Sequence, residues 1–310
     1  MTALSLELLG VTKAYRKFVA LDDVSLKCEG PRAVGYLGPN GAGKTTTLKV
    51  LTNLVHSTRG RALVNGVDVA ERHRETLVNI GAIVETPEPY GTFTVHDTLE
   101  MAGEFRGMSS ESIRDRIAYF DTTLQLPPLS QRMASLSKGL RQRVVIAGAL
   151  LGDPPIILLD EPTSGLDPAE RVKIRNLVLA LKRDHLILMS THLLGEVTET
   201  CDDVVFLNHG RILLTSSMMD IQSQADGQWV EVGFLEPVDA ARLDGLPHKE
   251  RAIVRVTDRR FRMVCDETQV ARAELTDALR RIGPLTDFHP VGSPVEETYL
   301  RLMREEPPPN

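Results

Sequence analysis

Short apolar runs and amphipathic segments follow one another along the first 220 residues. The runs Ala33–Leu37, Ile156–Leu159 and Leu186–Met189 are continuous rather than alternating, as expected of strands buried on both faces. Helices are predicted over about residues 45–55, 94–121, 138–151 and 168–183. Strands separated by helices of this length predict an α/β fold with a mostly parallel sheet and helices on both of its sides.

Two further patterns belong to the same part of the chain. Leu6–Val11 starts an extended segment, and Arg61–Val69 holds Asn65-Gly66 between alternating apolar residues. Asn-Gly in that position predicts a hairpin with a type I′ turn, because both central residues must adopt a positive φ. The helical stretch that begins near residue 94 is interrupted at Pro127-Pro128 before the next helix.

The pattern changes after about residue 220. The predicted elements there are strands at Trp229–Phe234, Ala252–Thr257 and Phe261–Cys265, a short helix at 237–244 and an amphipathic helix at Val270–Ile282. This order, βαββα, is typical of a ferredoxin-like unit. We therefore expect a small α+β domain over residues 226–304 and a disordered, proline-rich tail over residues 305–310.

Composition restricts the class of protein. Hydrophobic residues make up 42% and charged residues 25% of the 310 residues, which is a globular balance. The net charge of −6 gives no general attraction for phosphate backbones, so nucleic-acid binding is disfavoured. The three cysteines, Cys28, Cys201 and Cys265, fit no disulfide framework or zinc site and indicate a reducing compartment. No stretch approaches the ~18 apolar residues of a bilayer span, so any span is expected in another chain.

A glycine-rich loop follows the first apolar run. Residues 38–45 fit G-x4-G-K-[ST], the pattern of a phosphate-binding loop. Glycines let successive backbone N–H groups turn towards a phosphate, and the following helix presents its positive N-terminus to the anion. Lys44 is expected to bridge the β- and γ-phosphates, and the Thr45 hydroxyl to ligate Mg²⁺. The residues expected around the nucleotide are Gly38, Pro39, Asn40, Gly41, Ala42, Gly43, Lys44, Thr45 and Thr46.

Two acidic residues end the second apolar run. Asp160 closes the strand Ile156–Leu159, so its carboxylate is expected at the sheet edge where ligands bind, holding Mg²⁺ through water. Glu161 can then reach a water that attacks the γ-phosphate and act as its general base. Alone, such a pair is more often a helix cap, but together with the phosphate loop upstream it favours nucleotide hydrolysis.

With these motifs the chain resembles the ATP-binding subunit of an ABC transporter over residues 5–220. Leu136–Leu140 stands where that family has its LSGGQ signature, Ser164–Asp167 stands at its D-loop, and His192 follows a strand as its switch histidine does. The resemblance implies a P-loop ATPase fold with an antiparallel β subdomain and a helical subdomain at about 88–150. It also implies a domain over residues 1–220 that uses ATP and Mg²⁺.

The resemblance also assigns roles to single residues. Two subunits of this family pair head to tail, so Ser137 and the Gly139 N–H would clasp the γ-phosphate bound to the partner. His192 would contact the γ-phosphate and help to place the attacking water, and Asp167 would lie across the dimer interface. Tyr15 stands where the family carries an aromatic residue that stacks on adenine.

Simpler explanations exist for these residues. Ser137 can cap its own helix, which is compatible with a contact to the partner's nucleotide, and Asp167 can cap the helix that starts at Pro168. A histidine after a strand is usually structural, so the role of His192 depends on the resemblance. Phe18 replaces Tyr15 as the stacking residue if the register differs.

The chain departs from the family pattern at a few positions. Lys138 and Leu140 replace a glycine and a glutamine of the signature, and Glu85 replaces the usual Mg²⁺-contacting glutamine. Glu85 before a proline resembles exporters of the bacitracin-resistance and lantibiotic-immunity type. Residues 293–300 resemble a short C-terminal motif of multidrug and antibiotic exporters, although Val295 and Tyr299 can also serve plain helix packing.

We therefore expect an ATPase subunit that drives export of a drug, peptide antibiotic or lipid-like substrate. It would form a homodimer, or pair with a second ATP-binding subunit, at the cytoplasmic face of the membrane, bound there through residues 88–135 and the Glu85 loop to a separate polytopic permease. The alternative is a soluble ABC-type ATPase acting on ribosomes or nucleic acid, which the acidic composition and the single ATPase core disfavour. A regulator without hydrolysis is disfavoured by Glu161 and His192.

Overall fold

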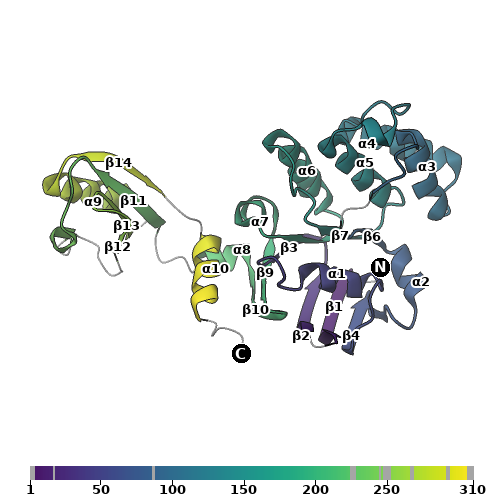
Figure 1. Cartoon of the computed structure of the whole chain (residues 1–310), viewed down its shortest axis with the longest axis horizontal. Helices are drawn as coiled ribbons and strands as arrows, with labels where there is room; N and C mark the ends of the chain where they lie inside the picture. Colours follow the sequence, from purple (N-terminus) through teal and green to yellow (C-terminus); the bar gives the residue numbers. More distant parts are fainter. Residues whose placement is uncertain are drawn as a thin grey trace. The chain divides into compact units, whose positions relative to one another are not determined.

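The computed structural model of the chain describes residues 4–16, 18–85, 88–223, 228–243, 246, 253–265, 269–290 and 294–305. Its contacts divide the chain into two compact units, Met1–Ser217 and Met218–Pro308 (Figure 1). Each unit has a hydrophobic core of its own, so each is described by itself.

A six-stranded sheet forms the centre of the first unit, in the order β10-β9-β3-β8-β7-β6. Its strands are β3 (Arg32–Leu37), β6 (Ile80–Ile83), β7 (Ile156–Asp160), β8 (Leu186–Thr191), β9 (Asp203–Asn208) and β10 (Arg211–Ser217). All neighbours pair in parallel except β9 and β10, which confirms the predicted sheet. The register sets Leu37 opposite Thr191 and Asp160 opposite Ser190. The carboxyl ends of β3, β7 and β8 therefore meet at one edge, where ligands bind in open α/β sheets.

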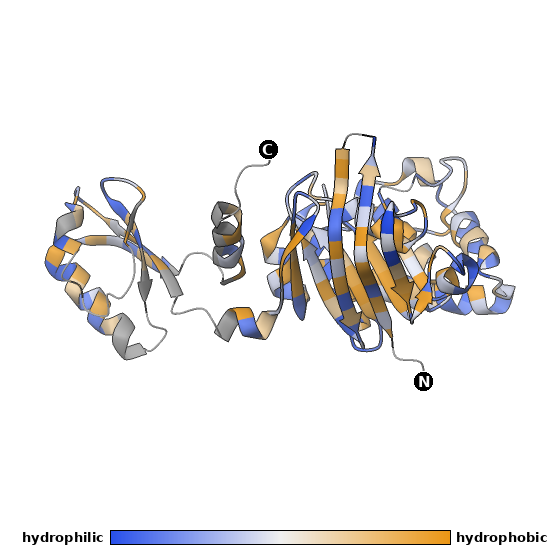
Figure 2. Ribbon diagram, turned by 90° about the horizontal axis from the view of Figure 1, so that it is seen from below, coloured by the Kyte–Doolittle hydropathy of each residue, from blue (hydrophilic) through white to orange (hydrophobic). Residues whose placement is uncertain are grey.

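An antiparallel sheet forms a second layer of this unit, in the order β2-β1-β4-β5. Its strands are β1 (Ser5–Tyr15), β2 (Phe18–Glu29), β4 (Arg59–Val64) and β5 (Val67–Asp68). Asn65 and Gly66 have φ of 51° and 77°, so the β4–β5 turn has the two positive φ angles expected of type I′. Leu48 and Leu51 of α1 (Lys44–Leu51) are buried in one core with residues of both sheets. In Figure 2 the strands of this unit carry long hydrophobic stretches, whereas its helices mix hydrophobic and polar residues.

The other helices of the first unit are α2 (His73–Val78), α3 (Val95–Phe105), α4 (Ser110–Leu124), η1 (Met133–Ser135), α5 (Lys138–Leu150), α6 (Pro168–Leu181) and α7 (Leu194–Thr200). Figure 1 shows α3 to α6 on the opposite side of the six-stranded sheet from α1. Two sequence predictions were wrong in detail. The predicted helix at 94–121 is two helices, because Gly107 adopts φ of 72° after α3. The helix predicted to reach residue 55 ends at Leu51, where Asn53 takes a left-handed φ of 55°.

The second unit contains a four-stranded antiparallel sheet in the order β12-β13-β11-β14. Its elements are α8 (Met218–Ser223), β11 (Gln228–Phe234), η2 (Ala240–Leu243), β12 (Val254–Arg255), β13 (Arg260–Cys265), α9 (Gln269–Ile282), β14 (Leu285–Pro290) and α10 (Pro294–Glu305). The helix predicted at 237–244 is only a 3-10 turn, and β14 was not predicted. With β14 added, the succession is that of a ferredoxin-like unit whose first helix is reduced. Ala252 and residues 306–310, which include most of the predicted tail, lie outside the described residues.

Charge pairs join the strands on one face of this sheet. The Glu231 carboxylate accepts hydrogen bonds of 2.9 Å from Arg260 Nη1 and from Arg262 Nε on the neighbouring strand. The bond from Arg262 is the main cause that holds the pKa of Glu231 below its usual value, and the bond from Arg260 adds to it, against desolvation. Val232 on the same strand and Phe261 on β13 are buried with Leu279 of α9. One face of the sheet is thus apolar and covered by α9, and the other carries paired charges.

Candidate nucleotide-binding and catalytic site

The phosphate loop joins β3 to α1 and lies close against the backbone of β9 and of β2. A Cβ atom on Gly38 would lie 2.2 Å from the Leu207 carbonyl oxygen, and one on Gly43 would lie 2.6 Å from the Ala20 carbonyl oxygen. Gly43 also has φ of 110°, which other residues rarely adopt. Helix α1 has no side-chain cap and no acidic residue in its first turn. The start of α1 therefore keeps the character of an anion site.

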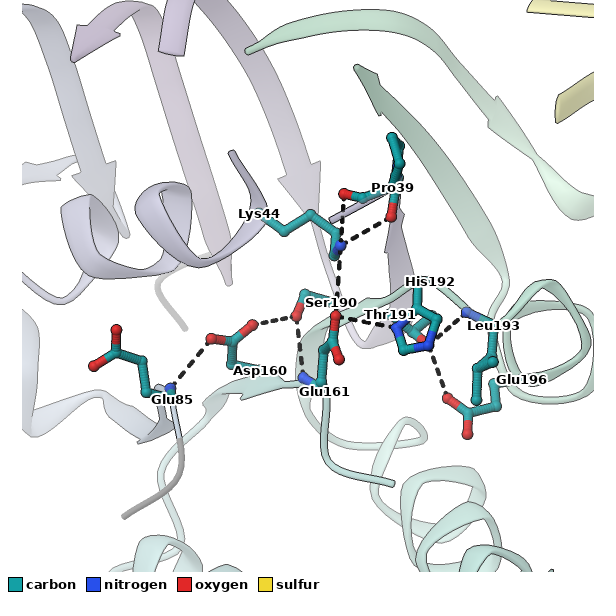
Figure 3. A network of polar contacts seen from close by, with 11 residues as sticks. Pro39, Lys44, Glu85, Asp160, Glu161, Ser190, Thr191, His192, Leu193 and Glu196 are labelled. Carbon is teal, nitrogen blue, oxygen red and sulfur yellow. Dashed lines mark hydrogen bonds and ion pairs between the residues drawn. The ribbon is translucent and has the colours of Figure 1, made fainter. Parts of the chain in front are cut away.

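Lys44 places its ammonium group at the centre of this loop. Its side chain is only 5% exposed, and Nζ donates hydrogen bonds to the carbonyl oxygens of Gly38 (2.8 Å) and Pro39 (3.1 Å). Nζ also lies 3.5 Å from Glu161 Oε1 (Figure 3). The ammonium group is thus held by two neutral carbonyl oxygens and one carboxylate. The charged oxygens of a polyphosphate are stronger acceptors than neutral carbonyl oxygens and can replace them.

Asp160 ends β7 with a carboxylate that is oriented from both sides. Ser190 Oγ donates to Oδ1 over 2.5 Å, and the backbone N–H of Glu85 donates to Oδ2 over 3.1 Å. Asp160 is buried, so these two bonds fix the direction of its charge at the sheet edge. Ser190 was not predicted as a site residue. Its only signal in the sequence is a hydroxyl directly after the apolar run of β8.

Glu161 adopts a strained backbone conformation next to this aspartate. Its φ is 45°, a left-handed value that costs about 1–3 kcal/mol for a non-glycine residue and persists only where the surroundings impose it. Its N–H donates to both the carbonyl oxygen and Oγ of Ser190, each over 3.1 Å. Oε1 lies 3.2 Å from His192 Nδ1 and 3.5 Å from Lys44 Nζ. The structure thus brings together three residues predicted from separate parts of the chain.

Glu85 is placed differently from the other predicted metal ligands. Its backbone N–H contacts Asp160, but its carboxylate forms an ion pair with Lys49 of α1. Figure 3 shows the Glu85 carboxylate turned away from Asp160. The structure therefore brings the Glu85 backbone, rather than its carboxylate, to the expected metal site. Neither Lys49 nor this ion pair was predicted, because 36 residues separate the two side chains in the chain.

Ser137 and Asp167 both cap their own helices. Ser137 Oγ accepts from the Leu140 N–H over 3.3 Å at the start of α5, and Asp167 Oδ1 accepts from the Glu170 N–H over 2.9 Å at the start of α6. These are the simpler roles considered for them, and neither role excludes a contact with a nucleotide on a partner subunit. Gly139 lies so close to α6 that a Cβ atom there would approach Glu170 Cγ to 2.7 Å.

A buried arginine connects α5, the helix that follows Ser137, with α6. Arg143 of α5 is 5% exposed and donates from Nη2 to Glu170 Oε1 over 2.9 Å. It also donates from Nη1 to the carbonyl oxygens of Leu124 and Gln125, at the end of α4. The segment that carries Ser137 and Gly139 is therefore tied to α6 and to α4 at once. Arg143 was not predicted, since nothing in the local pattern distinguishes it from other arginines on a helix.

The two candidate adenine-stacking residues both lie at the surface. Tyr15 and Phe18 face each other across the turn between β1 and β2, and their side chains are 43% and 61% exposed. Lys13 Nζ lies 4.8 Å from the centroid of the Tyr15 ring. Either ring is accessible to a base, so stacking on Tyr15 stays a prediction.

The residues present fit a magnesium ion only together with a phosphate ligand. Among the described residues, no group of three or more His, Cys, Asp or Glu side chains could hold a metal ion. Magnesium in phosphate sites takes one or two protein ligands and completes its shell with phosphate oxygens and water. The hydroxyl of Thr45, the second residue of α1, and the oriented Asp160 carboxylate supply hard oxygen donors of that kind.

Comparison with known proteins identifies the family. Residues 21–164 match the family model described as ABC transporter. The chain is 30% identical over 292 residues to the uncharacterized ABC transporter ATP-binding protein YxlF of Bacillus subtilis (strain 168), covering 94% of this chain and 97% of that protein. This chain belongs to the ABC transporter ATP-binding proteins. It is also 33% identical over 216 residues to the Nod factor export ATP-binding protein I of Cupriavidus metallidurans, covering 68% of this chain and 70% of that protein.

A solved structure supports the same assignment. The fold is similar to a dimeric, post-hydrolysis structure of the ATP-binding cassette MJ0796 bound to ADP and phosphate, with a TM-score of 0.63 and 26% identity over 69% of this chain and 98% of that chain. The predicted resemblance and the P-loop ATPase fold are thus confirmed. As an ABC transporter ATP-binding protein, the chain is an ATP-binding ATPase, and subunits of its family pair in dimers and work with transmembrane subunits. The alternative of an ATPase acting on ribosomes or nucleic acid is not favoured.

Proposed function

We propose that two copies of this ABC transporter ATP-binding protein close head to tail around two ATP molecules and drive export through a separate polytopic permease. The observation that carries the proposal is the cluster of Lys44, Asp160, Glu161 and His192 at the carboxyl edge of the sheet. It places a buried cation, an oriented carboxylate and an acid–histidine pair around one point beside the phosphate loop.

The geometry gives each of these residues a step in hydrolysis. Lys44 exchanges the carbonyl oxygens of Gly38 and Pro39 for the β- and γ-phosphate oxygens of ATP. Glu161 accepts a proton from the attacking water, and His192, 3.2 Å from its carboxylate, holds the water and the γ-phosphate in line. Mg²⁺ held by Thr45 and Asp160 would neutralise charge that develops on the phosphates.

The remaining predicted residues act at the edges of this site. Tyr15 stacks on adenine, while Ser137, the Gly139 N–H and Asp167 meet the nucleotide and the interface of the partner subunit. Both Ser137 and Gly139 stand at the start of α5, where N–H groups and the helix dipole favour an anion. Glu85 becomes a metal contact only after it leaves Lys49.

Exposed apolar residues before and after the Glu85 loop support contact with a permease. Three large apolar side chains are between 65% and 83% exposed: Val78 at the end of α2, Tyr90 in the loop before α3, and Phe105 at the end of α3. Large apolar side chains exposed to this extent are typical of interaction sites when they gather into a patch. No helix within the described part of the chain is long and apolar enough to cross a membrane. We assign residues 88–135 and the Glu85 loop to the permease contact, at the cytoplasmic face of the membrane.

Three observations favour export of a drug, peptide antibiotic or lipid-like substrate. One similar protein is named for the export of Nod factor, Glu85 stands in place of the usual glutamine, and α10 carries the exporter-like C-terminal motif. Ser293, which begins that motif, lies outside the described residues. Nucleic acid is no part of this proposal, because the chain has a net charge of −6.

A pull-down from detergent-solubilised membranes of the source cells tests the permease partnership. Tagged Glu161→Gln protein with Mg-ATP is expected to recover a polytopic membrane protein in stoichiometric amount. Phe105→Asp in the same background should lose that protein and keep ATP binding, since Phe105 is exposed and away from the phosphate loop. Leu235→Asp, which changes an exposed apolar residue of the second unit, is the matched control and should retain it. Recovery of ribosomes, of nucleic acid or of no membrane protein would contradict the proposal.

A further inference from the structure

Glu196, in the first turn of α7, connects two segments that carry catalytic residues. Its Oε1 accepts a hydrogen bond from the Thr163 hydroxyl, and its Oε2 accepts one from the Thr191 hydroxyl over 2.9 Å. We propose that Glu196 is a positioning residue, whose bridge between Thr163 and Thr191 holds Glu161 and His192 at the separation that hydrolysis requires. This inference rests on the roles proposed above for Glu161 and His192.

The bridge reaches both catalytic residues through very short pieces of chain. Thr163 lies two residues beyond Glu161, and Thr191 directly precedes His192. Thr191 Oγ1 also accepts a hydrogen bond of 3.0 Å from the Leu193 N–H, so one hydroxyl fixes the backbone on both sides of the histidine. Glu161 Oε1 and His192 Nδ1 lie 3.2 Å apart (Figure 3). This is the distance that the proposed Glu196 bridge maintains.

Hydrogen bonding, rather than packing, determines where the Glu196 carboxylate lies. Glu196 borders a cavity of about 410 Å³ between α6 and α7, so its side chain has room to take other positions. Thr163 and Thr191 are buried, with 5% and 2% of their surface exposed, and each hydroxyl needs an acceptor there. An ionised carboxylate is an acceptor only, so it can satisfy both hydroxyl donors at once.

Glu199 offers a matched control on the same helix. Its side chain is 57% exposed and forms an ion pair with Arg175 of α6 rather than with Thr163 or Thr191. Glu199→Gln removes the same charge from α7 and removes an ion pair between α7 and α6. It therefore measures what a purely structural change in this region does to the enzyme.

Glu196→Gln tests the bridge directly. The Thr163 and Thr191 hydroxyl groups donate to different oxygens of Glu196. Glutamine keeps the size of the side chain but replaces one of these acceptor oxygens by an NH₂ donor, so one hydroxyl loses its acceptor in this geometry. We expect kcat for ATP hydrolysis to fall roughly 10- to 100-fold, as small misplacements of catalytic groups do, with ATP affinity unchanged within about twofold. Glu199→Gln should keep the parental kcat. A Glu196→Gln protein with the parental kcat, or with kcat and ATP affinity reduced together, would overturn the inference.

Two further variants keep the test decisive. Thr163→Val removes one of the two hydroxyl groups at nearly constant size, and it should also lower kcat. This variant replaces Glu196→Gln as the test if Glu196→Gln does not fold. The double variant with both Glu161→Gln and Glu196→Gln should have the same kcat as Glu161→Gln alone, because both substitutions act on the same step. If Glu161→Gln itself hydrolyses ATP at the parental rate, the proposed role of Glu161 fails. If Glu161→Gln is inactive while Glu196→Gln and Thr163→Val keep the parental kcat, only the bridge is wrong.

Discussion

Replacing Glu161 by glutamine is expected to leave ATP binding intact and to lower the rate of hydrolysis by roughly 10²- to 10⁴-fold, the usual contribution of a general base. The amide is nearly the same size, so the left-handed backbone at Glu161 and its bonds to Ser190 are retained. What is lost is the carboxylate that we propose takes the proton from water, whose Oε1 lies 3.2 Å from His192 Nδ1 and 3.5 Å from Lys44 Nζ. Phosphate release measures the rate, and binding of a fluorescent ATP analogue measures the affinity.

The matched control for this variant is Glu199→Gln, which removes an acidic group from an exposed ion pair outside the site. It should hydrolyse ATP at the parental rate. A Glu161→Gln protein that also hydrolysed at the parental rate would move the general base to another residue. A loss of ATP affinity equal to the loss of rate would instead mean that Glu161 supports binding rather than proton transfer.

Replacing Lys44 by methionine is expected to abolish ATP binding at the concentrations that saturate the parental protein. Removing one partner of a buried charge contact costs about 2–5 kcal/mol, which lowers affinity from roughly 30-fold to several thousand-fold. Lys44 is 5% exposed at the centre of the phosphate loop, and no second lysine contacts Gly38 or Pro39 among the described residues. Titration with a fluorescent ATP analogue gives the two dissociation constants to compare.

Lys182→Met is the control for this second prediction. Lys182 also binds a backbone carbonyl, that of Thr200, and a carboxylate, that of Asp202, but it lies away from the phosphate loop. Its removal should leave ATP affinity within about twofold of the parental value. Equal losses for the two variants would indicate a general effect of losing a bound lysine, and an unchanged affinity for Lys44→Met would contradict its assignment to the phosphates.

Local patterns predicted most of the first unit because its strands and turns depend on short-range physics. The apolar runs at β3, β7 and β8 became buried parallel strands, and Asn65-Gly66 became the expected hairpin turn. The same patterns missed where elements stop. Asn53 ends α1 early and Gly107 divides the predicted helix at 94–121, since single left-handed residues interrupt helices without changing the apolar periodicity around them.

The candidate site also contains residues that the sequence predicts and residues that it does not. Lys44 could be predicted from the phosphate-loop pattern, and Asp160 and Glu161 from their place at the end of an apolar run. The role of His192 could be predicted only from the resemblance to the family. Their supporting partners could not, since these pairings depend on tertiary distance rather than on spacing. The unpredicted contacts are Ser190 to Asp160, Lys49 to Glu85, Arg143 to Glu170, and Glu196 to Thr163 and Thr191. Ser137 and Asp167 show a further limit, because a helix cap and a contact with a partner subunit use the same residue.

The most direct test of the proposed cycle is the mass in solution of Glu161→Gln protein, measured by light scattering with Mg-ATP and with Mg-ADP. If two copies close around two ATP molecules and hydrolysis reopens them, the ATP sample has twice the 34.2 kDa mass of the chain, and the ADP sample has a single such mass. A mass of 34.2 kDa at saturating ATP, or the same mass with both nucleotides, would contradict the account.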